Sequence, residues 1–218
     1  MRWSMSPNQA PLPVSLAERH GGVDIVFSNH YKRVQPDDDP AEMIDRYAAV
    51  SNLGTTNVLR AFAPLPRDGA RLLVVASRAG SLRALAPVLH ARFDGDLESP
   101  DDVDSAVRTW RDAVREGRAA GQAWPAWINI PSKIGQVAAI RVLARQRRAD
   151  DLRRGILIAA VCPGLIDTGA SRLWLDTTRA QTPAEAARGL LDLALGPDPD
   201  PGFYGELVLS GKVVPWQP

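Results

Sequence analysis

The polar residues that could act on a substrate stand where apolar runs of the sequence end and where a helical pattern begins. Ser77 follows the apolar run 72–76, and Asn129 and Lys133 lie four residues apart at the start of a helical pattern. Side chains four residues apart lie on one face of a helix, so Asn129 and Lys133 can reach the same ligand. A carboxamide can polarise a carbonyl group by donating a hydrogen bond, but it is not a usable general acid near neutral pH. A proton would have to come from another group.

Two residues after the first apolar run could supply that proton. His30 and Tyr31 follow the run 23–27 and the polar residues Ser28 and Asn29. Histidine is the side chain whose ordinary pKa lies closest to neutral pH, so His30 suits the role. The alternative is that His30 and Tyr31 only fill space.

Other common site chemistries are not indicated. Residues 76–80 do not form the Gly-x-Ser-x-Gly turn of a serine hydrolase. His20, His30 and His90 do not have the spacing of metal ligands. Cys162 ends an apolar run, where a small inert thiol is the usual case.

The elements that must position these residues alternate between strands and helices. The runs 23–27, 72–76 and 156–161 are almost continuously apolar, as is typical of strands buried on both faces. The run 206–209 alternates more, and we predict an edge strand there.

Apolar residues at helical spacing predict helices over 41–62, 133–148 and 183–195. The third helix has Thr182 as its N-cap and Glu185 three residues later, which is the capping-box pattern. The basic end of the second helix is interrupted by acidic residues, so we expect a solvated helix face there and no nucleic-acid patch.

Alternating strands and helices predict an α/β fold, a Rossmann-like doubly wound parallel sheet in a single domain over 1–218. Residues 82–124 form a longer, charged segment that interrupts the alternation of strands and helices. We predict an insertion there, with an exposed helix over 100–118. Residues 1–13 contain three prolines and are expected to be irregular.

Composition excludes several classes of protein. The chain has 218 residues, of which 45% are hydrophobic and 23% charged, so disorder is not indicated. A formal net charge of +1 favours neither nucleic acid nor an anionic membrane as a partner. No signal peptide or membrane span is evident, and a single cysteine fits a reducing compartment. We therefore expect a cytoplasmic protein that binds a small-molecule substrate.

Several segments, in order, resemble the short-chain dehydrogenase/reductase family and, within it, the carbonyl reductase branch. The resemblance extends over about residues 22–216. The segments are 28–31 (Ser-Asn-His-Tyr), 51–55 (Ser-Asn-Leu-Gly-Thr), 74–80 (Val-Val-Ala-Ser-Arg-Ala-Gly), 81–85 (Ser-Leu-Arg-Ala-Leu), 124–125 (Trp-Pro), 132–135 (Ser-Lys-Ile-Gly) and 162–164 (Cys-Pro-Gly).

The resemblance implies hydride transfer between NADP(H) or NAD(H) and a carbonyl compound or alcohol. Ser77 matches the serine that hydrogen-bonds the substrate oxygen, and Lys133 matches the lysine that holds the nicotinamide ribose. Asn52 matches the supporting asparagine, which we expect to hold a helix distortion or a water near Lys133. The cofactor-binding residues that the resemblance implies are Asn29, Lys133, Pro163, Gly164 and Thr168.

The sequence departs from the family pattern at the proton donor. The family's tyrosine would stand four residues before Lys133, where this chain has Asn129. We keep Asn129 and His30 as candidate catalytic residues beside Ser77, Lys133 and Asn52. The source of the proton is left open.

A second departure concerns the cofactor phosphates. The family's Gly-x-x-x-Gly-x-Gly loop, which binds the pyrophosphate at a helix N-terminus, does not occur in this sequence. The first three strands of the family are also expected to be absent, through truncation, a misplaced start or design of a fragment. This loss argues against cofactor binding and leaves the run 23–27 as an exposed sheet edge, which predicts self-association.

Three functions follow from these observations. The first is NAD(P)H-dependent reduction of a carbonyl compound, with activity impaired or lost. The second is a non-redox enzyme, an isomerase, cyclase or lyase that reuses the pocket. The third is a non-catalytic interaction protein whose exposed sheet edge pairs with another chain.

Overall fold

A five-stranded sheet forms the centre of the protein. The computed structural model describes residues 12–197 and 199–218. The sheet order is β1-β2-β3-β4-β5, with the first four strands parallel and the last antiparallel. The strands are β1 (Val23–Ser28), β2 (Pro66–Val75), β3 (Leu157–Cys162), β4 (Leu207–Leu209) and β5 (Lys212–Val214).

The strands follow the apolar runs of the sequence. All six residues of β3 are buried, as its continuous hydrophobicity predicts. The prediction of an edge strand over 206–209 is wrong, because β4 lies between β3 and β5. The sequence analysis missed β5, which has only three residues and buries none of them fully.

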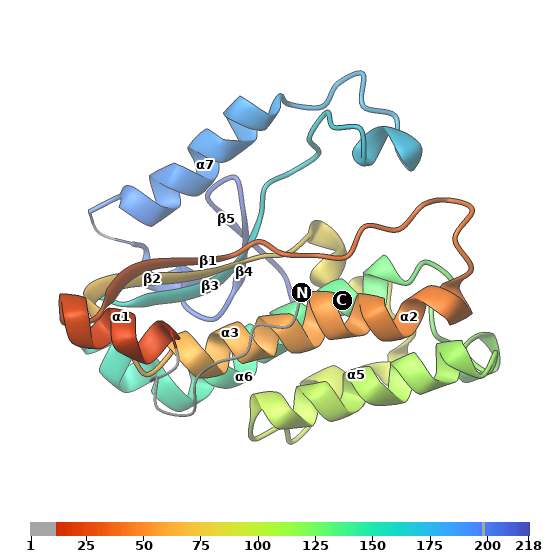
Figure 1. Cartoon of the computed structure of the whole chain (residues 1–218), viewed down its shortest axis with the longest axis horizontal. Coiled ribbons are helices and arrows are strands. Elements are labelled where there is room, and N and C mark those ends of the chain that lie inside the picture. The colour runs from red at the N-terminus through yellow and green to blue at the C-terminus, as the bar shows by residue number, and fades with distance from the viewer. Residues whose placement is uncertain (1–11, 198) are drawn as a thin grey trace.

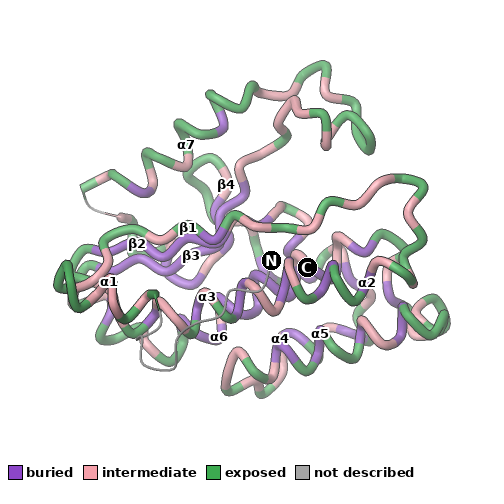
Figure 2. Tube along the Cα trace, viewed as in Figure 1, coloured by how far each residue is buried: buried purple, intermediate pink, exposed green. Residues whose placement is uncertain are grey.

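Helices cover both faces of the sheet, which confirms the predicted α/β architecture (Figure 1). One face carries α7, and the other carries α1, α3 and α6, with α5 farther from the sheet. Figure 2 shows the buried strands between these layers. The helices are α1 (Leu12–His20), α2 (Pro40–Ala48), α3 (Gly54–Phe62), α4 (Ala91–Asp94), α5 (Pro100–Arg115), α6 (Asn129–Arg153) and α7 (Pro183–Leu195).

The predicted helix over 41–62 is continuous but not uniform. Between α2 and α3 the chain forms a π-helical segment, Ala49–Leu53, and Ser51 and Asn52 within it are buried. A π-helical turn contains one extra residue, so some of its backbone carbonyls lose their usual partners in the helix. Such segments are frequent at functional sites.

The segment over 82–124 packs against the rest of the protein. Its main helix, α5, lies against α2 and α6, and Trp110 on α5 is fully buried. The predicted exposure of this helix is therefore wrong on its inner face, where its apolar residues repeat at helical spacing. α5 begins with the Ser99 and Asp102 capping box.

The N-terminal boundary of regular structure lies earlier than expected. The predicted irregular segment ended at residue 13, but α1 begins at Leu12. Pro13 lies in the first turn of α1, where the missing N–H of proline costs no helix hydrogen bond. The rest of the predicted segment, residues 1–11, lies outside the described residues.

In the described part of the chain, β1 pairs with β2 alone, so its other edge is open. Ile25 and Phe27 on β1 remain 39% and 38% exposed. Within residues 12–197 and 199–218, every helix is too short or too polar to cross a lipid bilayer.

Candidate active site

A cavity of about 500 Å³ lies where the carboxyl ends of β1, β2 and β3 meet. Ligands of open parallel sheets bind at this edge, and the volume suits a small molecule. Every predicted site residue except Asn52 lines this cavity. These residues are Asn29, His30, Ser77, Asn129, Lys133, Pro163, Gly164 and Thr168.

A second cavity, of about 550 Å³, lies under α7 beside β3 and β4. Cys162 and Pro163 line it, together with acidic residues such as Glu185. It contains none of Ser77, Asn129 and Lys133, so the first cavity is the candidate active site.

The end of β2 places Ser77 at the cavity. Ser77 is the N-cap of a short 3₁₀ turn, Arg78–Gly80, and its Oγ accepts a hydrogen bond from the backbone N–H of Ala79 at 3.2 Å. Because the oxygen accepts this bond, the hydroxyl hydrogen remains available to donate. Ser77 can therefore donate to a substrate oxygen without losing its role in the turn.

Lys133 carries its amine into a buried position with neutral partners. Its Nζ donates to Gln136 Oε1 at 2.8 Å and more distantly to the carbonyl of Val75 at 3.4 Å. None of the ion pairs between described residues includes Lys133. Burial lowers the pKa of Lys133 to about 8, and interaction with Cys162 opposes this shift slightly.

The π-helical segment sets the position of this lysine through Gln136. The carbonyl of Ser51 accepts a hydrogen bond from Gln136 Nε2 at 2.8 Å, and Gln136 accepts from Lys133. The hydroxyl oxygen of Ser51 also accepts from the backbone N–H of Lys32 at 3.1 Å. One segment thus fixes both the loop after β1 and the partner of Lys133.

Asn52 joins the π-helical segment to the first turn of α6. Its Nδ2 donates to the carbonyl of Ser132 at 2.9 Å, and Ser132 Oγ donates back to Asn52 Oδ1 at 2.8 Å. A Cβ at Gly135 would lie 2.9 Å from Asn52 Nδ2, so the close approach requires glycine. Asn52 does not line the cavity, and its side chain joins the π-helical segment to α6, which agrees with the expectation that it holds a helix distortion.

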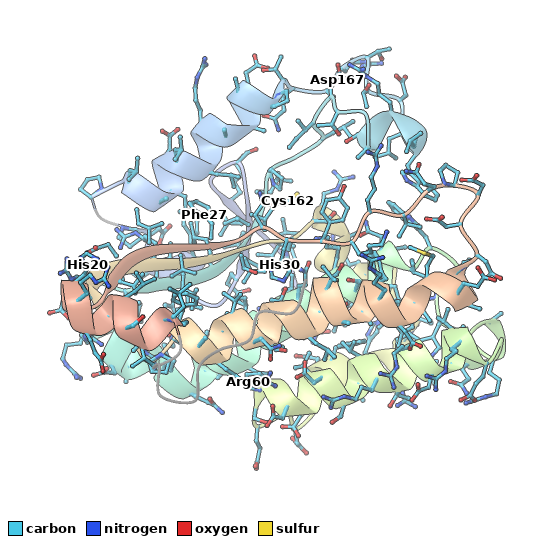
Figure 3. All side chains as sticks on the ribbon, viewed as in Figure 1. His20, Phe27, His30, Arg60, Cys162 and Asp167 are labelled. Carbon is cyan, nitrogen blue, oxygen red and sulfur yellow. The ribbon has the colours of Figure 1, made fainter. Side chains whose placement is uncertain are left out.

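His30 lies between the sheet and the helix formed by α2 and α3 (Figure 3). Its Nδ1 is 3.4 Å from Ser28 Oγ, and a Cβ at Gly54 would lie 2.5 Å from its Nε2. Burial lowers the pKa of His30, the charge of Lys133 lowers it further, and the backbone of Val50 raises it. A lowered pKa leaves the imidazole neutral at neutral pH, so a role as cationic acid is disfavoured.

The structure adds one site residue that the sequence analysis missed. Tyr47 on α2 is buried beside the cavity, and its hydroxyl donates to Asn129 Oδ1 at 3.0 Å. Burial raises the pKa of Tyr47 to about 12, which keeps the phenol protonated. The sequence shows Tyr47 only as an apolar position of a helix, and no local signal connects it with a residue 82 positions away.

Two loops border the mouth of the cavity. Arg33, after β1, donates from Nη2 to the carbonyl of Gly169 at 3.2 Å and links the loops. The indole rings of Trp127 and Trp174 line the cavity with their centroids 6.2 Å apart. Asp167, labelled in Figure 3, pairs with Arg172, and hydrogen bonds from Arg172 and Thr177 lower its pKa to about 2.

The cavity fits one end of a nicotinamide cofactor. The five residues implied for cofactor binding, Asn29, Lys133, Pro163, Gly164 and Thr168, line it together. In the described part of the chain, no glycine-rich helix N-terminus lies at this edge to bind phosphates, and α2 follows three aspartates, residues 37–39. The described residues therefore fit the nicotinamide end and not the pyrophosphate. Among them, no group of three His, Cys, Asp or Glu side chains could hold a metal ion.

Comparison with known proteins finds similarity to reductases. The chain is 28% identical to carbonyl reductase [NADPH] 1 of Mus musculus and 26% identical to that of Rattus norvegicus, each over 92% of this chain and 73% of the relative. Salutaridine reductase from Papaver somniferum has a similar structure, with a TM-score of 0.73 at 21% identity over 89% of this chain and 75% of that one. NADPH-bound carbonyl reductase from chicken fatty liver has a TM-score of 0.60 at 17% identity over 94% of this chain and 71% of that one. No family model matches the chain.

The fold and the site define a Rossmann-like domain with a ligand cavity at the carboxyl edge of its sheet. In sequence the chain is similar to carbonyl reductases, and in fold it is similar to solved structures of short-chain dehydrogenases/reductases.

The lowered pKa of Lys133 predicts how stability depends on pH. The folded-state pKa of about 8 lies below the ordinary value of 10.5, so the unfolded chain binds more protons between these values. Stability should therefore rise with pH across this window. Relative to a Lys133→Met variant, we expect a gain of up to about 3 kcal/mol in the free energy of unfolding across this window.

Urea unfolding of both proteins at a series of pH values measures this difference. Lys32 and Lys212, the other two lysines, are present in both proteins, so their contributions cancel in the comparison. Parallel stability curves for the two proteins would show that the amine of Lys133 is not desolvated.

Proposed function

We propose that this chain binds a carbonyl compound with its oxygen between Ser77 and Asn129 and takes part in reduction of that carbonyl. NADPH-dependent carbonyl reduction is the function of this branch of the family. The supporting observation is that one cavity collects Ser77, Asn129 and Lys133 from β2 and α6.

The polar groups of the cavity suit an oxygen on which negative charge develops. Ser77 retains a hydroxyl hydrogen to donate, and Asn129 has an amide N–H₂. Donors fixed before reaction stabilise such charge without reorganisation. Lys133 adds a cation below its pKa of about 8.

A nicotinamide cofactor, when bound, supplies the hydride for reduction. Asn29, Lys133, Pro163, Gly164 and Thr168 would hold its nicotinamide end. These residues give the cofactor's adenosine and phosphates no binding site of their own. NADP(H) or NAD(H) binding is accordingly part of the proposal.

The same two donors support a second candidate function. Ser77 and Asn129 could polarise a carbonyl for an isomerisation, cyclisation or elimination that needs no hydride. A third candidate is an interaction protein that uses the open edge of β1. The single buried cysteine, Cys162, is compatible with a cytoplasmic location, which we also propose.

The first prediction concerns recognition of the carbonyl group. We expect 4-hydroxyacetophenone to bind more tightly than 4-ethylphenol, which has a methylene in place of the carbonyl. Ser77→Ala should reduce this preference about three- to tenfold, the effect of one hydrogen bond. The indole N–H signals of Trp127 and Trp174, which line the cavity, report binding by nuclear magnetic resonance.

Ser105→Ala is the matched control, because Ser105 lies exposed on α5. Equal affinity of the unmodified protein for the two phenols would contradict the proposal.

The second prediction concerns the cofactor. Because the described residues fit only the nicotinamide end, nicotinamide mononucleotide should bind within about threefold of NADPH, a difference below 1 kcal/mol. Calorimetric titration with NADPH, NADH and the mononucleotide measures this, and Lys133→Met should weaken all three. Absence of saturable binding would rule out the reductase and favour a non-redox reaction.

The third prediction concerns the open edge of β1. Unpaired backbone groups and the part-exposed side chains of Ile25 and Phe27 favour self-association at this edge. Phe27→Lys should shift sedimentation towards monomer. Val88→Lys is the control, because Val88 is 75% exposed on a different surface segment. A compact monomer at every concentration of the unmodified protein would contradict the prediction.

A further inference from the structure

A phenol reaches the candidate active site from a helix other than the one that carries the family motif. Tyr47 lies on α2, and its hydroxyl donates to Oδ1 of Asn129 at 3.0 Å. Asn129 is the first residue of α6 and stands where the family motif has tyrosine. The hydrogen bond therefore joins Asn129, the residue that replaces the family's tyrosine, to a tyrosine from another helix.

This bond determines what Asn129 can offer a ligand. A carboxamide has one acceptor oxygen and one N–H₂ donor on opposite branches of the same planar group. When Oδ1 accepts from Tyr47, Nδ2 is turned away from the phenol and keeps its hydrogens for another partner. Among the described residues, none of the hydrogen bonds in the protein uses Nδ2 of Asn129.

We propose that Tyr47 is a positioning residue, which fixes the amide of Asn129 so that its N–H₂ donates to the carbonyl oxygen of the substrate. The inference rests on the proposed function, because it assigns the donor that recognises the carbonyl. Tyr47 and Asn129 together take the place of the family's single tyrosine. Asn129 contacts the substrate, and the phenol of Tyr47 contacts Asn129.

Packing holds the phenol in place. Tyr47 is buried, and its ring meets the fully buried indole of Trp110 edge to face, with the centroids 6.5 Å apart. Such an edge-to-face contact stabilises this orientation of the ring. α5, which carries Trp110, is therefore connected to the site through Tyr47.

The neighbouring hydroxyl does not compete for Asn129. Ser132 lies beside the phenol, but its Oγ donates to Asn52 Oδ1 at 2.8 Å. Asn52 is in turn fixed by its bond to the backbone of Ser132. Because the Ser132 hydroxyl hydrogen is donated to Asn52, the phenol of Tyr47 is the donor that sets the orientation of Asn129.

The chemistry differs from proton transfer by tyrosine. The Tyr47 hydrogen is held by Asn129, and the raised pKa of Tyr47, about 12, keeps that hydrogen in place at neutral pH. The pair polarises a carbonyl without giving up a proton. Binding of a ketone should consequently show no dependence on Tyr47 ionisation below about pH 10.

The first test examines the amide in the ligand-free protein. We expect Tyr47→Phe to lower the order parameter of the Asn129 side-chain amide, measured by ¹⁵N relaxation, and Tyr31→Phe to leave it unchanged. Tyr31 makes the matched control because it lines the same cavity and has no hydrogen bond to Asn129. An Asn129 amide as rigid in Tyr47→Phe as in the unmodified protein would overturn the inference.

The second test uses the pair of probes, 4-hydroxyacetophenone and 4-ethylphenol. Tyr47→Phe and Asn129→Leu should each weaken ketone binding about three- to tenfold and leave 4-ethylphenol unchanged. The double variant should bind the ketone no more weakly than Asn129→Leu alone, because the two changes remove the same interaction. Additive losses would overturn the inference.

The outcomes separate this inference from the proposed function. A ketone preference that survives Tyr47→Phe contradicts the role of Tyr47 and leaves carbonyl recognition intact. Equal binding of both probes by the unmodified protein contradicts carbonyl recognition, and the relaxation measurement then still decides whether Tyr47 orients Asn129.

We expect the Tyr47→Phe variant to fold. Phenylalanine keeps the ring that packs on Trp110, and the urea midpoint verifies this. Asn129→Asp separates the two roles of residue 129, because a carboxylate accepts a hydrogen bond from the phenol but has no N–H to donate to the substrate. This variant should fold and lose the ketone preference, and an unchanged preference would overturn the inference.

Discussion

The π-helical segment Ala49–Leu53 is the constraint on which the site depends. The carbonyl of Ser51 within it accepts hydrogen bonds from the hydroxyl of Thr55 and from Nε2 of Gln136 on α6, and a buried carbonyl needs such partners. The bond to Gln136 orients the acceptor of Lys133. The side chains of Ser51 and Asn52 then fasten the loop after β1 and the first turn of α6. A local irregularity in one helix thus positions groups from three parts of the chain.

The site that results is built mainly from neutral donors and a desolvated amine. Ser77 and Asn129 line one cavity and each has hydrogens to donate, and Lys133 lies among neutral acceptors with its pKa lowered to about 8 by burial. Burial also keeps Tyr47 protonated and favours neutral His30. Low polarity strengthens each hydrogen bond to a ligand and disfavours charge on the residues themselves. The cavity therefore suits stabilisation of charge that develops on the substrate.

Several segments that resemble carbonyl reductases in sequence meet at this edge of the sheet. The strand ends, the lysine on α6 and the loop that contains Pro163 and Gly164 line one cavity there. The sequence differs from the family pattern where the substrate oxygen would be held, because Asn129, with Tyr47 behind it, stands in the place of tyrosine.

The sequence by itself determined the buried strands and most helices, because nearly continuous apolar runs and helical spacing are local properties. It also determined that Ser77, Asn129 and Lys133 share one edge, since parallel strands end together and residues four apart share a helix face. Only the tertiary structure decided that β5 covers β4, that α5 is buried through Trp110, and that Asn52 faces Ser132 and not the cavity. It alone brought Tyr47 to Asn129, 82 residues apart. Such pairs depend on how helices pack across the fold, and sequence spacing contains no information on packing between distant segments.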